Sequence, residues 1–295
     1  MNSRLLWTLL FLTVPIFGVG LFVMSASSPG GWLPDNISEH GADIDYLFYV
    51  ILAITGFTFV LTEVLLVWAM WTARGKNNGK STYTHGNHRL EIIWTLATVA
   101  ILLYVAFTQI PVWSKAKYYG NRPKKTPDVL VTASQFHWSL RYPSWLAAEN
   151  RPHLLNTFNP SLPQSFALSN ELHVFASKDE PVLVHVQTLD VQHAFWLPAA
   201  RVKQDALPGH LIPVWFKIDP DMVKQVDQRS EKHKKLRKIT VGTDTFEVYE
   251  FEWTCAELCG WGHSMMRARL YVHPSRDQYH RWIKAASAQH LPQNQ

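Results

Sequence analysis

The sequence has few cysteines and few charged residues, and it lacks several common cofactor motifs. Two cysteines in 295 residues exclude a disulfide-rich scaffold, a multi-cysteine zinc fold and an iron–sulfur cluster held by cysteines alone. The absence of Cys-x-x-Cys-His excludes covalently attached haem, and the absence of Walker A and Gly-x-Gly-x-x-Gly motifs leaves nucleotide binding unsupported. Charged residues are 17% of the chain and hydrophobic residues 47%. Because the mean hydropathy is only −0.08, the apolar residues must be concentrated in particular segments.

Three long apolar runs lie in the N-terminal part of the chain. Leu5–Met24 and Ile92–Trp113 contain no charged residue, and Tyr46–Trp71 contains only Glu63. About 20 apolar residues span a bilayer core, so each run is long enough. We predict that the second and third runs form a transmembrane hairpin. Glu63 is then an ionisable group inside a span, which predicts either a helix–helix hydrogen bond to a partner subunit or a role in proton transfer.

The first run has two interpretations. Arg4, the apolar stretch and the small residues Ser25–Ser27 are typical of a secretory signal peptide with its cleavage site. The apolar stretch exceeds the roughly 7–15 residues of a signal core, which favours a retained transmembrane helix. No cysteine follows the run, so a lipoprotein anchor is excluded.

The loop charges predict the orientation. No Lys or Arg occurs between Arg4 and Arg74. The basic residues of the following loop are Arg74, Lys76, Lys80 and Arg89. Because cytoplasmic loops carry an excess of Lys and Arg, residues 72–89 are predicted to be cytoplasmic and residues 114–295 to lie outside. The extra leading span favours a bacterial plasma membrane, and the external position argues against a nucleic-acid partner.

The external part, residues 114–295, shows the alternating pattern of an all-β domain. The predicted strands are Val129–Tyr142, Glu171–Lys178, Pro181–Leu189, Leu211–Asp219, Phe246–Thr254 and Arg267–His273. Many short strands separated by turns suggest a sandwich or barrel, and a helix is predicted over Ser275–Gln289. The basic run over residues 229–238 is interpreted either as a solvated surface insertion or as a docking patch for an acidic partner.

Side chains with metal-binding chemistry gather in two segments of this domain. They are His193, Cys255, Cys259, His263 and Met266. Thiolate, imidazole and thioether groups form a soft ligand set that copper prefers. Taken alone, Cys-x3-Cys is typical of an extracellular disulfide, and a zinc site would leave Met266 without a role. The complete set of two cysteines, two histidines and a methionine favours copper. The histidines interpreted as ordinary surface or strand residues are His40, His185, His210 and His273.

Five segments carry a family resemblance. They are Leu90–Thr95, Gln135–Ser139, Asp190–His193, Lys203–Gly209 and Cys255–Met266. Together they resemble subunit II of the haem–copper cytochrome c oxidases, which carries a dinuclear copper A centre. The resemblance covers most of residues 40–275 and implies transmembrane helices followed by an all-β, cupredoxin-like sandwich. The expected domains are an N-terminal span or signal peptide (1–27), a helical hairpin (28–113) and an external copper A domain (114–295).

The resemblance also implies roles for individual residues. The two copper ions would be bound by the side chains of His193, Cys255, Cys259, His263 and Met266 and by the backbone carbonyl of Glu257, with both cysteines bridging. The Glu257 side chain would reach a magnesium ion shared with subunit I. Glu91 matches a glutamate at the mouth of a proton pathway into subunit I, although a carboxylate there would also stabilise a helix N-terminus.

The implied function is electron transfer within an oxidase complex. The chain would accept electrons from cytochrome c or a related donor and pass them to haem in subunit I, where oxygen is reduced to water and protons are pumped. The implied partners are subunit I with its haem and copper B, subunit III, the donor and the lipid membrane. Haem would be present only in the partner subunit.

The electron route departs from the family pattern. Phe136 stands where the family usually has a tryptophan that admits electrons, so the neighbouring aromatics His137, Trp138 and Trp261 become candidates, with Trp138 preferred. A basic donor would favour an acidic docking face. The candidate acidic residues are Asp190, Asp205, Glu247, Glu250 and Glu252. Alternatively, the basic run over residues 229–238 selects an acidic donor.

Other functions are compatible with parts of the pattern. A membrane-tethered copper chaperone or thiol-redox protein could also use Cys-x3-Cys with a histidine. That alternative predicts a thioredoxin-like βαβ pattern around the cysteines, which the sequence does not show. A quinol oxidase subunit II would lack the copper ligands, and a nitrous oxide reductase would need a much longer chain.

Overall fold

The computed structural model describes residues 3–27, 32–72, 83, 85–125, 127–143, 165–229 and 234–290. The chain forms two compact units. The first unit is Met1–Pro34 with Asp43–Val112, and the second is Asp35–Ala42 with Trp113–Gln295. Residues 73–82, which hold most of the basic residues used for the predicted orientation, lie outside the described part.

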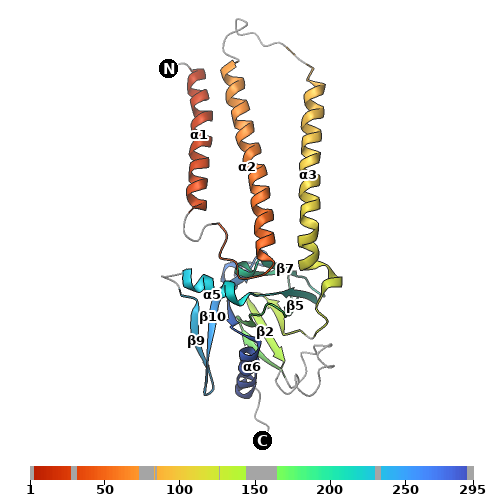
Figure 1. Ribbon diagram of the computed structural model, residues 1–295, viewed down its shortest axis with the longest axis vertical. Helices are drawn as coiled ribbons and strands as arrows, with labels where there is room; N and C mark the ends of the chain where they lie inside the picture. Colours follow the sequence, from red (N-terminus) through yellow and green to blue (C-terminus); the bar gives the residue numbers. More distant parts are fainter. Residues whose placement is uncertain are drawn as a thin grey trace. The chain divides into compact units, whose positions relative to one another are not determined.

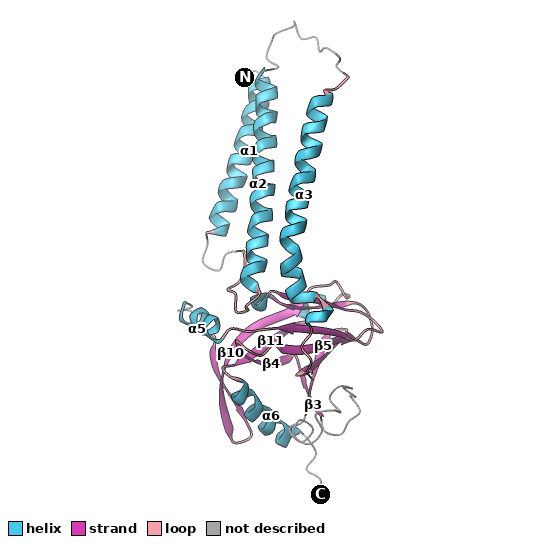
Figure 2. Ribbon diagram, turned by 45° about the vertical axis from the view of Figure 1, so that its right-hand side comes forward, coloured by secondary structure: helices cyan, strands magenta, loops and turns pink. Residues whose placement is uncertain are grey.

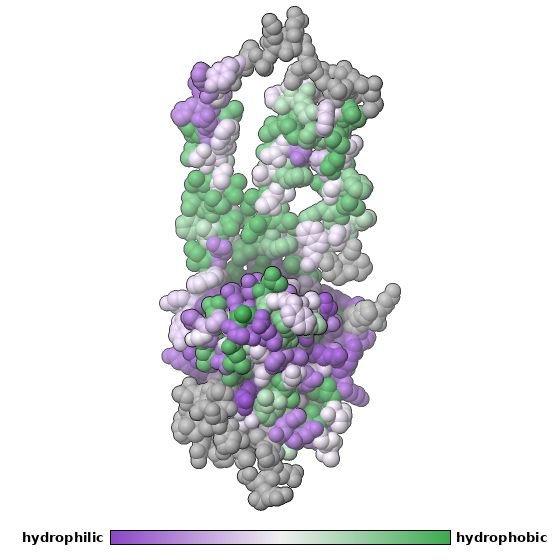
Figure 3. All heavy atoms as spheres, turned by 180° about the vertical axis from the view of Figure 1, so that it is seen from behind, coloured by the Kyte–Doolittle hydropathy of each residue, from purple (hydrophilic) through white to green (hydrophobic). Residues whose placement is uncertain are grey.

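Long apolar helices dominate the first unit. They are α1 (Ser3–Ala26), α2 (Gly41–Thr72) and α3 (His88–Lys117), and each is long and apolar enough to cross a membrane (Figure 1). Their outer surfaces are apolar over most of their length (Figure 3). Threonine hydroxyls inside the helices donate to carbonyls one turn earlier, as Thr98 does to Trp94 at 2.8 Å, so no water is needed to satisfy them. The second and third predicted spans are confirmed as long apolar helices, and whether the first run is a signal peptide or a retained span stays a prediction.

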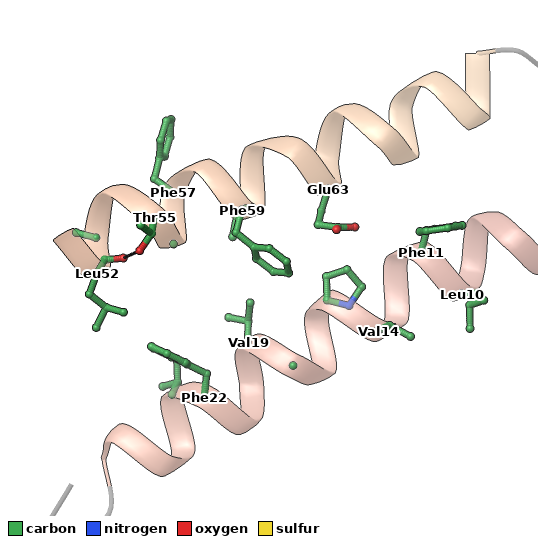
Figure 4. A pocket seen from close by; sticks show the side chains of 16 residues that line it. Leu10, Phe11, Val14, Val19, Phe22, Leu52, Thr55, Phe57, Phe59 and Glu63 are labelled. Atoms are coloured by element: carbon green, nitrogen blue, oxygen red, sulfur yellow. Dashed lines mark hydrogen bonds between the residues drawn. The ribbon is translucent and has the colours of Figure 1, made fainter. Parts of the chain in front are cut away.

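Glu63 lies on α2 and points toward α1 (Figure 4). The groove between the two helices has a volume of about 1010 Å³, and Thr55 and Glu63 are its polar lining side chains. The Thr55 hydroxyl is satisfied by the carbonyl of Ile51 at 2.9 Å. Both roles predicted for Glu63, a hydrogen bond to a partner subunit and proton transfer, stay predictions.

A two-sheet β-sandwich forms most of the second unit (Figure 2). One sheet has the order β3–β2–β1–β5–β8, and the other has the order β4–β11–β10–β6–β7 with β9 paired to β10. The strands of the first sheet are β1 (Val129–Ser134), β2 (His137–Pro143), β3 (Ser165–Ser169), β5 (Val182–Thr188) and β8 (Ile212–Phe216). Those of the second are β4 (Glu171–Phe175), β6 (His193–Leu197), β7 (Val202–Ala206), β9 (Leu236–Val241), β10 (Asp244–Cys255) and β11 (Arg267–His273). The predicted all-β sandwich after helical spans is confirmed.

Alternate residues of the strands fill the space between the sheets. On β2, Trp138, Leu140 and Tyr142 are buried, and on β10, Phe251 and Trp253 are buried from the opposite sheet. This period of two follows from the pleat, which turns successive side chains to opposite faces. The core therefore extends directly to the end of β10, where the cysteines begin.

Helix α6 (Arg276–His290) covers one part of the second sheet. It begins at Ser275, whose hydroxyl accepts a hydrogen bond from the backbone N–H of Gln278 at 3.2 Å. Its Tyr279 and Trp282 side chains are buried, and Trp282 stacks on His173 of β4. The predicted helix over Ser275–Gln289 is confirmed.

The segment that precedes α2 belongs to the sandwich unit. Ile37 is fully buried, donates its N–H to the carbonyl of Ala199 and accepts from the N–H of Asp219, both at 2.9 Å. The Ser38 hydroxyl donates to the carbonyl of Ala200 at 2.8 Å. These bonds tie the segment to the short 3-10 helix η3 (Pro198–Ala200) and to the chain that follows β8.

Two sequence predictions about the strands were wrong or incomplete. Val129–Tyr142 was predicted as one strand, but it is the hairpin β1–β2, which reverses at Gln135 and Phe136. The buried alternating positions are Val129, Val131 and Ala133 before the turn and Trp138, Leu140 and Tyr142 after it, so the alternation changes phase at the turn, and the prediction overlooked this change. The elements that the prediction missed are β3, β6, β7, β9 and helix α5 (Pro220–Arg229).

The basic run over residues 229–238 is only partly an insertion. Its residues 230–233 lie outside the described part, but Leu236–Lys238 begin β9 and pair with β10. Arg237 lies 3.4 Å from Glu250, and Lys238 lies 3.6 Å from Glu247. The strand extends the second sheet, and its charges are partly neutralised by the acids of β10.

Candidate metal centre

Strand pairing brings the candidate ligands together. Cys255 is the last residue of β10, and the loop from Ala256 to Met266 leads into β11. His193 is the first residue of β6, which pairs with β10 through Cys255 and Phe195. A residue 62 positions away in sequence therefore comes to lie beside Cys255.

The two thiols have matching surroundings. Cys255 Sγ lies 3.8 Å from His193 Nδ1, and Cys259 Sγ lies 3.6 Å from His263 Nδ1. Met266 Sδ lies 3.4 Å from Cys259 Sγ, and the carbonyl oxygen of Glu257 lies 3.2 Å from Cys255 Sγ. Ligand atoms of His193, Cys255 and Cys259 all fall within 4.8 Å of one another, and both cysteines are free. The cluster fits a metal site.

Burial and charge support a cation at this position. His193, Cys255, Cys259 and Met266 are all buried. Burial, followed by the neighbouring Cys255, raises the pKa of the Cys259 thiol to about 11. Two buried thiols so close together would resist ionisation unless a positive charge lay between them. The residues present therefore fit a thiolate-bound metal.

Asp190 orients His193, a role that the sequence analysis did not assign to it. Its Oδ1 lies 2.9 Å from His193 Nε2 and accepts from the Val191 N–H at 2.7 Å, while its Oδ2 accepts from the Gln135 N–H at 2.7 Å. Partial burial works against ionisation, but these hydrogen bonds prevail and hold the pKa of Asp190 at about 2. With Nε2 engaged by a carboxylate, Nδ1 is left to face the sulfur. The signal in the sequence was an Asp three residues before the ligand.

The β1–β2 turn closes over the metal loop. The Gln135 side-chain amide donates to the carbonyl of Cys259 at 2.5 Å. A Cβ added at Gly262 would come within 2.5 Å of the Phe136 ring, so the glycine allows this close approach. Phe136 also packs edge-on against Trp261, with ring centroids 5.1 Å apart. The loop is therefore held from a second sheet as well as from its own strand.

The other predicted site residues occupy different positions. Trp138 is fully buried and its ring lies 6.0 Å from that of His193, so it forms part of the inner wall and is closed to a donor protein. Glu257 contributes its carbonyl, and its side chain is partly exposed. Glu91 belongs to the other compact unit, in the first turn of α3, with its carboxylate 3.5 Å from His88 Nδ1.

Part of the predicted acidic face is ion-paired within the chain. Glu250 pairs with Arg237 and Arg269, and Glu247 pairs with Lys238. Asp190 is committed to the hydrogen bonds around His193. Two of the five acids considered for donor docking are thus ion-paired, and Asp190 and Asp205 accept hydrogen bonds within the chain, Asp205 from the Gln192 side chain at 3.5 Å.

Comparison with known proteins gives a consistent family. The family "Cytochrome C oxidase subunit II, transmembrane domain" matches residues 26–112, and "Cytochrome C oxidase subunit II, periplasmic domain" matches residues 128–232. The "Alternative cytochrome c oxidase subunit 2" of Bradyrhizobium diazoefficiens is 26% identical, over 91% of this chain and 88% of that protein. The "Cytochrome c oxidase subunit 2" of Cereibacter sphaeroides is 25% identical, over 90% of this chain and 84% of that protein.

A solved structure is also similar. The crystal structure of the periplasmic domain of subunit II of cytochrome oxidase from Bradyrhizobium japonicum is 24% identical, with a TM-score of 0.36. The aligned region covers 56% of this chain and 96% of that structure.

Proposed function

Because the chain belongs to the cytochrome c oxidase subunit II family, we propose that it receives electrons from a c-type cytochrome at a copper A centre and passes them to haem in subunit I. The chain is a subunit of an oxidase of the haem–copper type, and it is membrane-anchored with a periplasmic domain. In the proposal, oxygen is reduced to water in subunit I, and protons are pumped there.

The observation that carries the proposal is the paired donor set. Each thiol has one imidazole nitrogen within 3.8 Å, and a thioether and a backbone carbonyl complete the set. Two half-sites, each with one thiol and one imidazole, suit two copper ions better than one zinc ion, which would leave Met266 unused. When bound, the copper pair would supply an acceptor for one electron at a time.

The protein residues hold this donor set in place. Asp190 fixes the ring of His193, and the Gln135 amide fixes the backbone at Cys259. Trp138 and Phe195 close the inner side of the centre and exclude water. Protein groups that do not move when the copper pair changes its charge keep the reorganisation energy small, which suits electron transfer.

Two acidic residues have proposed roles outside the copper set. The partly exposed Glu257 side chain is free to reach a magnesium ion shared with subunit I. Glu91 is exposed at the start of α3, where a proton pathway into subunit I would open. Its position in the first turn also supports the simpler role of stabilising the helix N-terminus.

The proposed setting is a bacterial plasma membrane with the copper domain on the periplasmic face. The proposed partners are subunit I, subunit III, a cytochrome c or related donor, and the lipid bilayer. The alternative of a copper chaperone or thiol-redox protein is disfavoured by the local fold, because Cys255 ends a strand of an antiparallel pair and not the strand of a βαβ unit.

The proposal is tested on the full-length chain purified in detergent within its complex. We expect two copper ions per chain in addition to those of subunit I, and uptake of one electron from hexaammineruthenium(II) by the centre. Cys259→Ser should remove the centre, whereas Ser264→Ala, in the same loop, should retain it. A wild-type chain that holds one copper ion or none contradicts the proposal.

A further inference from the structure

Trp261 is the most prominent feature on the surface of the metal loop. Its side chain is 85% exposed, although it stands two residues from each of the candidate ligands Cys259 and His263. Leu258 and Met265 in the same loop are 80% and 59% exposed. Exposed apolar side chains on a loop that also carries candidate metal ligands indicate a surface for another molecule.

The indole is held on a rigid support. The Phe136 ring lies 5.1 Å from the Trp261 ring, centroid to centroid. Gly260, with φ +138°, and Gly262 flank the tryptophan, and a Cβ on either would press on Phe136. Backbone hydrogen bonds from His263 to Gly260 and from Met265 to Gly262, at 3.1 and 3.0 Å, close the loop around it. These contacts restrict the position of the Trp261 side chain, so little conformational entropy is lost when a partner binds.

The loop that carries Trp261 and the turn that packs on it contain no charged side chain, and the Asp190 carboxylate accepts a hydrogen bond from the Gln135 N–H of that turn. Residues 258–266 and 135–138 contain no Asp, Glu, Lys or Arg. Among the described residues of the β9–β10 hairpin, Arg237 and Lys238 are paired with acids of β10. Recognition at this surface must then rest on apolar contact, with charges contributing little.

We propose that Trp261 is the main docking contact for the electron donor, and that the donor is a one-electron carrier protein whose contact face is apolar. This inference rests on the proposed function and adds the residue and the type of partner. One electron leaves the reduced centre of the donor and one is gained by the metal centre. Trp261 shortens the path between them and is itself neither oxidised nor reduced, and no proton or covalent bond changes.

The first test measures binding without turnover. A zinc-substituted cytochrome c, which cannot donate electrons to the centre in the dark, is titrated onto the purified oxidase. Trp261→Ala should weaken binding about tenfold or more, as truncation of a central aromatic contact does, and Trp261→Phe should restore part of it. Trp196→Ala, a partly exposed tryptophan outside the loop, serves as the control and should bind within about twofold of wild type. Equal binding by wild type and Trp261→Ala would overturn the proposal.

The second test measures the dependence on salt. Between low and physiological ionic strength, kcat/KM with the preferred cytochrome c should change less than about threefold, whereas a charge-steered pair changes tenfold or more. A change of the larger size would overturn the apolar partner. Reduction by hexaammineruthenium(II) separates the two proposals. If this small reductant reduces the centre of Trp261→Ala normally while donor binding is unchanged, only the docking inference fails.

Discussion

Two pairs of histidines lie in the same β-sandwich, and they differ in what their ring nitrogens face. His193 and His263 each turn Nδ1 toward a cysteine sulfur, at 3.8 and 3.6 Å. His173 and His273 instead face each other, Nδ1 to Nε2, at 3.2 Å. The first pair leaves nitrogens available for a cation, whereas the second uses them inside the core. A metal centre is therefore recognised by the direction of the nitrogens and not by the number of histidines.

The surroundings of the two pairs explain the difference. Asp190 binds Nε2 of His193 and so directs Nδ1 toward the sulfur of Cys255. His173 stacks on Trp282, with ring centroids 3.9 Å apart, and its Nε2 lies 3.9 Å from a Glu171 carboxylate oxygen. Burial lowers the pKa of both His173 and His273, and their proximity lowers that of His273 further. This second pair is a neutral part of the packing under α6.

The largest effect, on copper affinity, is expected at the metal pair, His193 and His263. His193→Ala removes one of the two proposed imidazole ligands and leaves a cavity beside Cys255. Copper affinity should fall more than about 100-fold, because losing a ligand exceeds the effect of losing its supporting hydrogen bond. Competition with a chelator, followed by copper analysis, measures the change. Full copper retention would remove His193 from the ligand set.

The matching substitution in the core pair, His173 and His273, should lower the stability and leave copper binding unchanged. His273→Ala should lower the free energy of unfolding by about 2–3 kcal/mol, since it leaves a cavity among buried aromatic rings. Copper content per folded chain should not change. Denaturant titration and copper analysis of the same sample measure both quantities. A loss of copper without a loss of stability would contradict the assignment of His173 and His273 to the core.

A smaller effect on affinity is expected from the residue that orients the metal pair. Asp190→Ala frees Nε2 of His193, so the ring is no longer fixed. Copper affinity should drop about 10- to 100-fold, as is typical for carboxylates that support metal-bound histidines. Asp205→Ala is the matched control, because its carboxylate lies 3.5 Å from Gln192 and makes no bond to His193. Equal affinities for the two variants would contradict the role of Asp190.

The smallest effect concerns pH. The folded-state pKa of His273 is well below its ordinary value of 6.5, so the unfolded chain binds a proton that the folded chain does not. Stability is therefore fully present above about pH 6.5 and declines as the pH falls below it. The rings that surround His273 are those of His173, Phe246, Tyr279 and Trp282, and none of them supplies an opposing negative charge. His273→Phe should show a weaker decline between pH 7 and pH 5 than wild type in denaturant titrations. A steeper decline in the variant would contradict the neutral core pair.

Much of this molecule was predictable because its signals are local. The apolar runs, the helix after Ser275 and the string from Cys255 to Met266 depend on neighbours in sequence, and each was recognised. The role of Asp190 and the contact between Gln135 and Cys259 depend on a turn that packs against a distant loop. The β1–β2 turn carries no glycine or proline, so composition did not reveal it, and its one signal was the shift of the buried apolar positions from odd to even numbers. Strand β9 is masked by its charged residues.

The central claim is that Cys255, Cys259 and their two histidines hold a pair of copper ions that share one electron. The most direct measurement is the electron paramagnetic resonance spectrum of the oxidised, intact complex. The account predicts a signal whose hyperfine structure arises from two equivalent copper nuclei, and its loss in Cys255→Ser. A signal from a single isolated copper ion at this centre, or a disulfide between the two cysteines with no metal bound, would contradict it.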